Sequence, residues 1–479
     1  MISRFIIRNF RSIENLDITL SKLNAFIGYN NAGKSNIMDA LNIVLGEKWP
    51  MEPFTESDFH DYDQTKPISI EVRFAEPLLC RPDCQGFKLE SSGTGRADFR
   101  AIDANGKDCR YYRLNTEAKI ERSLLYLGLD RQAGNQLRPT GWTIYGKLLH
   151  HIERTITDEH RRDFKTSMDG DYTQYIEPYL QETLDSIKSY AKKQTGKDLT
   201  FSFNTVDPLN ILKNVRPYLI EGDGRRTDLE NVGSGIQSAV SIAIARAYSE
   251  IVRIPVTIAI EEPELYLHPH ASRHFYELLK ELSGGLLQVL YTTHNRCFVD
   301  VRDFKNIYLV NKVRDNTVVT NVNVLSSRPR ISDLDIISKT DENINEVFFS
   351  ECVILVEGFS DKIAWREALK KEGVNINLKN ISIIEVTGKN NLVFLADMIN
   401  SYGIRCYVII DYDGGANSRL ISDLKAIVGV DNVLVQNPNL EGLLGLGGKL
   451  NREQALTIIP GWFAANSTPT IFQSLAQVL

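Results

Sequence analysis

The spacing of apolar residues along this chain predicts an α/β protein. Alternating apolar and polar positions predict half-buried strands over residues 2–10, 16–20, 68–74 and 123–127. From about residue 142 to 197 the apolar positions recur every three or four residues, which is typical of amphipathic helices. We therefore expect strands in the first part of the chain and a helical segment after them.

Other apolar runs are continuous, which is typical of parallel strands buried on both faces. Runs of this kind cover residues 23–27, 256–260, 288–293, 352–356, 381–386 and 406–410. Strands that alternate with helices predict parallel sheets, and ligands bind such sheets at the carboxyl ends of their strands. Residues 326–345 are rich in Ser, Arg and Asp and break the pattern, so we expect a domain boundary there.

A phosphate-binding loop follows the first buried run. Its residues are Gly28-Tyr29-Asn30-Asn31-Ala32-Gly33-Lys34-Ser35, which match G-x-x-x-x-G-K-[ST] at every fixed position. In such a loop the backbone N–H groups of Asn30, Asn31 and Gly33 point at the phosphates of a nucleotide. Lys34 would reach the β- and γ-phosphates, and Ser35 would ligate Mg²⁺. The motif predicts that the chain binds ATP.

Two acids end the buried strand at 256–260. Glu261 would hold Mg²⁺ through water, and Glu262 would polarise the water that attacks the γ-phosphate. The next buried strand ends in His294, which would face the same phosphate. Upstream, Ser234, Gly235 and Gln237 open a predicted helix, where free N–H groups and the helix dipole favour an anion.

The order of these motifs resembles the core of ABC-type ATPases, and the opening IRNFRSIENLDITL resembles that of RecF/SMC-type members. The resemblance implies that Ser234, Gly235 and Gln237 contact the nucleotide held by a partner subunit, and hence a homodimer. We expect the ATPase to occupy residues 1–75 and 201–335. Residues 76–200 would then be an insertion, mainly helical, that forms the dimer.

The last third of the chain carries a second acidic pattern. Glu357 follows one buried strand and Asp361 lies one helical turn later; Asp411 and Asp413 follow another strand. Acids at successive parallel strand ends converge, and crowded carboxylates favour Mg²⁺ or Mn²⁺. The pattern resembles a Toprim domain, expected at residues 346–479. The alternative is that Asp411 and Asp413 only cap a turn.

Composition limits the function classes further. The chain has 479 residues and a net charge of −6, and no apolar run approaches a membrane span. Six scattered cysteines favour reduced thiols and a cytoplasmic location, although Cys80, Cys84 and Cys109 leave a zinc site open. Residues 341–479 carry 16 Asp and Glu against 11 Lys and Arg, so a phosphodiester would need metal ions to approach them.

An ABC head followed by a Toprim domain resembles the OLD (overcoming lysogenization defect) nuclease family. The resemblance implies an ATP-regulated, metal-dependent DNA endonuclease, often acting against phage and leaving room for a companion defence component. It also implies that Glu357, Asp361, Asp411 and Asp413 are metal ligands, joined by Glu441, with Lys449 as a candidate catalytic lysine. Two alternatives stay open: a RecF-like repair protein that binds DNA without cutting, and a topoisomerase- or primase-type Toprim enzyme.

Overall fold

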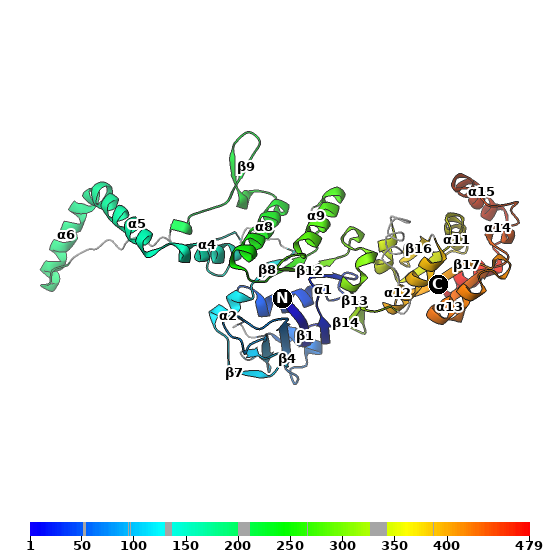
Figure 1. Cartoon of the computed structure of the whole chain (residues 1–479), viewed down its shortest axis with the longest axis horizontal. Coiled ribbons are helices and arrows are strands. Elements are labelled where there is room, and N and C mark those ends of the chain that lie inside the picture. Colours follow the sequence, from blue (N-terminus) through cyan, green and yellow to red (C-terminus); the bar gives the residue numbers. More distant parts are fainter. Residues whose placement is uncertain are drawn as a thin grey trace.

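Parallel sheets organise the two main parts of this chain, shown in a computed structural model (Figure 1). The structure describes residues 1–50, 54–93, 95, 97–129, 137–199, 211–265, 267–325, 343–386 and 388–479. Most of the predicted boundary at 326–345 lies outside the described residues, as do residues 201–210 at the start of the predicted second ATPase half.

The first parallel sheet forms the middle of the ATPase head. Its order is β14-β13-β3-β12-β11-β8, and only the edge strand β14 runs antiparallel. The strands are β3 (Leu23–Ile27), β8 (Leu124–Leu127), β11 (Val256–Glu261), β12 (Leu287–Thr293), β13 (Ile307–Val313) and β14 (Asn316–Asn321). Every residue of β3, β11 and β12 is buried, as their continuous apolar runs predicted.

Helices cover both faces of this sheet. They are α1 (Lys34–Leu45) on one face, and α8 (Ser234–Val252) and α9 (Pro269–Leu282) on the other. Successive strand residues point to opposite faces, so Ile258 packs with α8 and α9 while its neighbour Ala259 packs with α1. The face under α1 also meets the antiparallel sheet described next.

The antiparallel sheet has the order β2-β1-β4-β5-β6-β7. Its strands are β1 (Ile2–Phe10), β2 (Ile13–Thr19), β4 (Ile68–Phe74), β5 (Gly86–Ser91), β6 (Asp98–Ile102) and β7 (Asp108–Arg113). Helix α2 (Thr116–Glu121) then leads to β8, which pairs with β11 of the parallel sheet. The sheets of the head thus continue to residue 127, past the boundary expected at residue 75, and much of 76–127 is strand instead of helix.

The helical segment forms an arm that extends away from the head (teal in Figure 1). It consists of α4 (Ile144–Thr155), α5 (Asp158–Asp171), a π-helical turn (Tyr172–Ile176) and α6 (Glu177–Thr195). Helix α4 packs against α8, whereas α5, the π-helical turn and α6 contain no buried residue. A short hairpin, β9 (Tyr218–Ile220) and β10 (Arg226–Asp228), precedes α8.

The C-terminal domain contains the second parallel sheet, of order β16-β15-β17-β18. Its strands are β15 (Cys352–Val356), β16 (Ile381–Glu385), β17 (Arg405–Asp411) and β18 (Val433–Gln436). Helices α12 (Lys389–Ser401) and α13 (Ser418–Val428) cover one face. The other face is covered by α11 (Phe359–Lys371), α14 (Leu440–Leu443), α15 (Arg452–Ala465) and α16 (Thr470–Val478).

Short 3-10 helices complete the described elements. They are η1 (Glu56–Asp58), η2 (His60–Tyr62), η4 (Leu229–Asn231), η5 (Arg296–Phe298), η6 (Val301–Asn306), η7 (Ile344–Phe349), η8 (Asp413–Gly415) and η9 (Val430–Asn432). None of the described helices is both long and apolar enough to cross a membrane.

One apolar core runs from the head into the C-terminal domain. It contains Ile258 and Leu309 of the first parallel sheet together with Leu355 and Val408 of the second. Tyr402, at the end of α12, donates its hydroxyl hydrogen to the carbonyl oxygen of Phe304, 2.6 Å away. The two domains therefore share buried surface and are packed against each other.

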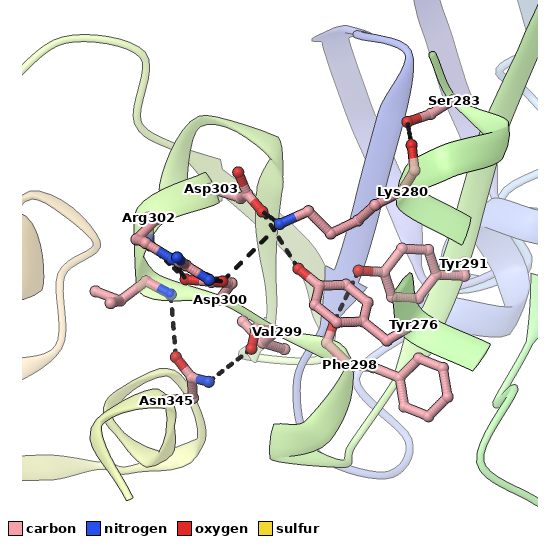
Figure 2. Close-up of polar contacts among 11 residues, drawn as sticks. Tyr276, Lys280, Ser283, Tyr291, Phe298, Val299, Asp300, Arg302, Asp303 and Asn345 are labelled. Atoms are coloured by element: carbon pink, nitrogen blue, oxygen red, sulfur yellow. Dashed lines mark hydrogen bonds and ion pairs between the residues drawn. The ribbon is translucent and has the colours of Figure 1, made fainter. Parts of the chain in front are cut away.

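A polar cluster lies beside this core, between α9 and η6 (Figure 2). Lys280 forms a 2.6 Å ion pair with Asp303. Asn345, in η7, accepts a 3.0 Å hydrogen bond from Val301 N and donates a 2.7 Å bond to Val299 O. One side chain of η7 thus satisfies the backbone on both sides of Asp300 and holds this loop to the segment that leads into the C-terminal domain.

Candidate nucleotide and metal sites

The P-loop lies between β3 and α1, at the carboxyl end of the first parallel sheet. Lys34 is 6% exposed and donates hydrogen bonds to the carbonyl oxygens of Gly28 (2.8 Å) and Tyr29 (2.9 Å). Burial lowers the pKa of Lys34, although three nearby carboxylates oppose this. The ammonium group thus lies inside the loop, where a phosphate would offer it a stronger partner than two carbonyl oxygens.

The two glycines of the P-loop are required by the protein itself. A Cβ atom on Gly28 would lie 2.0 Å from the carbonyl oxygen of Val310, and one on Gly33 would lie 2.0 Å from Oγ1 of Thr317. Both glycines also have positive φ angles, 151° and 104°. Packing of the loop against β13 and β14 therefore excludes larger residues, even before a phosphate approaches.

Ser35 and Glu261, the two residues expected to hold Mg²⁺, lie next to each other. Ser35 Oγ donates a 2.6 Å hydrogen bond to Glu261 Oε2, and Glu261 is 4% exposed. The hydroxyl of Tyr126 contacts the other carboxylate oxygen and also Asp39, at 3.2 Å. Tyr126 has no signal in the sequence, because β8 carries no motif and reaches the site only by pairing with β11.

Glu262 and His294 face each other across the ends of β11 and β12. His294 Nδ1 lies 3.5 Å from Glu262 Oε1 and 3.6 Å from Glu264 Oε1. The φ angle of Glu262 is 44°, an uncommon value for a residue with a side chain. Its N–H donates to Thr292 O at 3.0 Å, which helps to hold this conformation. The backbone thus directs Glu262 toward His294.

Glu264 is a site residue to which the sequence analysis gave no role. Its Oε1 accepts hydrogen bonds from Thr293 Oγ1 (2.7 Å) and from His294 N (3.0 Å). Its Oε2 is buried and has no hydrogen-bond partner among the described residues. This oxygen, Lys34 and the Ser35–Glu261 pair form a donor and acceptor set that fits a magnesium-bound triphosphate. The signal in the sequence was a third acid, two residues after the Glu-Glu pair.

Ser234, Gly235 and Gln237 lie at the start of α8, as predicted. Gln237 donates hydrogen bonds to the carbonyl oxygens of Glu230 (3.3 Å) and Val232 (3.0 Å), which positions its side chain over the preceding loop. In the described part of the chain, no hydrogen bond joins these three residues to the P-loop.

The acids of the C-terminal domain converge at the carboxyl end of its sheet. Glu357 follows β15, Asp361 lies in the first turn of α11, and Asp411 ends β17. Asp411 N donates a 3.2 Å hydrogen bond to Glu357 Oε1. Burial, and then the charges of Asp411, Glu357 and Glu441, raise the pKa of Asp361 to about 8. Full ionisation of the acids at this point on the sheet edge is thus disfavoured.

Burial and neighbouring acids act in the same way on Asp411. Its pKa is raised to about 7, first by burial and then by the charges of Glu357, Asp413 and Glu441. The five acids predicted as metal ligands therefore act on one another electrostatically, and divalent cations would relieve that repulsion. Among the described residues, however, no three acidic, His or Cys side chains already surround a point that could hold a metal ion. Side-chain rotation would have to complete a site.

Two amide side chains, which the sequence analysis did not assign, organise these acids. With its amide oriented to satisfy both ends, Gln436 donates to Asp411 Oδ1 (2.8 Å) and Asp361 Oδ1 (3.0 Å) and accepts from Trp365 Nε1 (2.9 Å). Asn417 donates to Asp411 O (2.7 Å) and Asp413 Oδ2 (3.2 Å). Gln436 ends the fourth strand of the sheet, and that position was its only signal in the sequence.

Lys449 and the three cysteines of the possible zinc site play no visible part. Lys449 is exposed, and no hydrogen bond or ion pair ties it to the described acids. Cys84 and Cys109 are buried, and their sulfur atoms donate to the carbonyl oxygens of Gly86 and Asp83. The structure thus supports neither residue set as a metal or catalytic centre.

Comparison with known proteins agrees with the two domains. Residues 1–124 and 87–299 match the family described as AAA ATPase domain. Residues 348–413 match the family described as Overcoming lysogenization defect protein-like, TOPRIM domain.

Three relatives align over most of the chain. An OLD nuclease of Thermus scotoductus is 28% identical over 93% of this chain and 92% of its own. The Old nuclease of Escherichia phage P2 is 27% identical over 86% of this chain and 77% of its own. Endonuclease GajA of Bacillus cereus is 22% identical over 96% of this chain and 81% of its own.

Fold, site and relatives together define a P-loop ATPase joined to a Toprim domain. The chain belongs to the AAA ATPase domain family, and its C-terminal domain is similar to the Toprim domain of overcoming lysogenization defect proteins. The family assignment made from the sequence motifs is thereby confirmed.

The nucleotide site can be tested by two substitutions. Lys34→Ala should reduce ATP hydrolysis to background, because the β- and γ-phosphates lose a positive charge. Glu262→Gln should retain ATP binding while turnover stops, because the carboxylate that polarises water is gone. Phosphate release and nucleotide titration measure the two effects. Hydrolysis by Lys34→Ala at the wild-type rate would contradict the site.

Charge repulsion at the Toprim edge predicts that removing one acid stabilises the metal-free protein. Asp361→Asn keeps the oxygen that accepts from Gln436 and removes a carboxyl group whose ionisation is opposed in the folded protein, since its pKa is raised to about 8. In buffer with EDTA it should raise the free energy of unfolding by about 1 kcal/mol or more. Added Mg²⁺ or Mn²⁺ should stabilise this variant less than the wild type. Thermal unfolding measures both effects, with Asp423→Asn, an exposed acid on α13, as the control.

Proposed function

We propose that this protein is an ATP-regulated DNA endonuclease that depends on divalent metal ions. The observation that carries the proposal is the convergence of five acids at the Toprim sheet edge, where burial and mutual repulsion raise the pKa values of Asp361 and Asp411. Such a set of oxygen ligands suits Mg²⁺ or Mn²⁺. When bound, the metal would activate water and neutralise charge on a phosphodiester.

The residues of the chain have separate tasks in this scheme. Glu357, Asp361, Asp411, Asp413 and Glu441 would hold the metal ions. Gln436 fixes the distance between two of these acids, since one amide group bridges them. Asn417 holds the turn after β17 in place, because it binds both the backbone of Asp411 and the side chain of Asp413.

The ATPase head supplies a second, distant chemistry. Lys34 and the backbone of the P-loop would hold the phosphates, and Ser35 and Glu261 the Mg²⁺ ion. Glu262 would accept the proton of the attacking water, and His294 would orient the terminal phosphate. Similarity to proteins named nucleases and an endonuclease favours cutting over the alternative of a RecF-like protein that only binds DNA.

The net charge also bears on the substrate. Residues 341–479 carry an excess of acids, so metal ions would have to mediate the contact of this domain with DNA. Defence against phage, a cytoplasmic location and a companion defence component belong to the same proposal, and rest on the family alone.

We further propose that the protein forms a homodimer through its helical arm and its ATPase heads. Apolar side chains at helical spacing are exposed on the arm: Ile176 (52%), Tyr179 (87%), Leu180 (40%), Ile187 (42%) and Tyr190 (66%). The interval of three, four and seven residues places them on one face. A second copy of the arm is a suitable cover for such a face, and it would let Ser234 of one subunit approach the nucleotide of the other.

Removing two large side chains from this face should weaken the dimer. Tyr179→Ser with Ile187→Ser deletes exposed apolar area without touching the core, so the fold should be retained while the dimer dissociates at lower concentration. Light scattering over a dilution series measures this. Leu378→Ser removes a similarly exposed residue (81%) from the Toprim domain and is the control. A double variant as dimeric as the control would contradict the proposal.

The nuclease is tested by nicking of supercoiled plasmid with Mg²⁺ or Mn²⁺. Asp411→Ala removes a charged ligand, so nicking should fall by orders of magnitude while ATP hydrolysis continues, because the two sets of acids lie in different domains. Glu262→Gln, assayed beside it, should lose ATP turnover, while the acids of the metal site are left unchanged by this substitution. Undiminished nicking by Asp411→Ala would contradict the proposed site.

A further inference from the structure

A pocket of about 440 Å³ joins the nucleotide site to the Toprim domain. One wall is formed by P-loop residues 28–30, His294 and two residues of β13. The opposite wall is formed by residues 348–351, which lead into the Toprim sheet, and by residues 403–405, which lead into β17. The nucleotide site and the C-terminal domain thus share one cavity.

The head side of this pocket is where the terminal phosphate of a bound nucleotide would lie. The ammonium group of Lys34 lies inside the loop, where the β- and γ-phosphates would bind. His294 lies outside the loop, with its Nδ1 atom 3.5 Å from Glu262 Oε1. Asn30 lines the pocket between them. A γ-phosphate therefore faces the cavity, whereas the rest of a nucleotide lies further along the loop.

The Toprim side of the pocket offers a free guanidinium group. Arg405, the first residue of β17, is exposed, and its side chain makes no hydrogen bond or ion pair to any described residue. Glu351 carries the opposite charge on the same wall, and its Oε1 accepts a 3.2 Å hydrogen bond from Asn380 Nδ2. An arginine without a partner in a pocket beside a P-loop is suited to bind phosphate oxygens.

The two walls are also joined directly. Tyr29, inside the P-loop, donates its hydroxyl hydrogen to the carbonyl oxygen of Phe349 at 3.2 Å. On the other side of His294, Arg296 binds Asn343 and lies 3.7 Å from Glu346. A movement of the P-loop or of His294 would therefore reach the Toprim domain through backbone segments only a few residues long.

We propose that Arg405 of the Toprim domain binds the γ-phosphate of the nucleotide held by the P-loop of the same chain, so that the nuclease domain itself distinguishes a triphosphate from a diphosphate. The proposal rests on ATP binding at the P-loop. Arg405 begins the strand that ends in Asp411. Arg405, which would bind the γ-phosphate, and Asp411, an acid of the metal site, thus lie at opposite ends of one β-strand.

The test compares affinities for a triphosphate and a diphosphate. AMP-PNP and ADP, each with Mg²⁺, are titrated into the full-length wild type and into Arg405→Ala, Arg405→Lys and Arg419→Ala. Arg405→Ala should lower the affinity for AMP-PNP about tenfold and leave that for ADP unchanged, because only the γ-phosphate reaches the pocket. Arg405→Lys should recover part of the loss. Arg419→Ala, an exposed arginine on α13, should behave as the wild type.

Two outcomes would overturn the inference. Equal affinities of Arg405→Ala and the wild type for AMP-PNP would show that the guanidinium does not reach the phosphate. An equal loss of affinity for AMP-PNP and ADP in Arg405→Ala would show that the substitution perturbs the structure and that Arg405 does not recognise the γ-phosphate. Lys34→Ala separates this failure from failure of the ATP site: if the P-loop were not the nucleotide site, Lys34→Ala would bind both nucleotides as the wild type does.

Discussion

Burial of parallel strands on both faces is the constraint on which both sites depend. A parallel strand has its polar ends at the sheet edges and an apolar interior, so functional side chains can only emerge where the strand stops. Glu261 ends β11 and Asp411 ends β17 for this reason. The same core runs under both sheets, and each acid is therefore anchored to a rigid apolar strand instead of a free loop.

Elements with a local signal could be predicted from the sequence. The P-loop, the Glu-Glu strand and the acids after β15 and β17 each combine an apolar run with a charged residue at its end. Residues whose role depends on pairing between distant strands gave no such signal. Tyr126 reaches Glu261 only because β8 pairs with β11, and Gln436 reaches Asp361 only because β18 pairs with β17.

The first half of the head extends beyond residue 75, and pairing between separate strands again explains the difference. Strands β5 to β7 have weak alternation and many turn residues, so they resembled the start of an insertion. Their membership of the first antiparallel sheet is set by hydrogen bonds to β4, which periodicity within one segment does not reveal. Glu264 was overlooked because a third acid beside two catalytic ones looks redundant until its buried oxygen is seen.

The shared core limits the replacement of either domain by the corresponding domain of another protein. Phe304 of the head packs edge-to-face against Phe394, and the Tyr402 hydroxyl donates a hydrogen bond to a carbonyl oxygen of the head. A cut before the Toprim strands would therefore expose apolar surface on both products. Asn345, at the seam, bonds backbone groups of the head with both ends of its amide. A Toprim domain from another protein would need a surface that packs against the head in the same way, in addition to the acids of the metal site. Recombination by simple fusion is therefore disfavoured, and the two domains are expected to be inherited together as one unit.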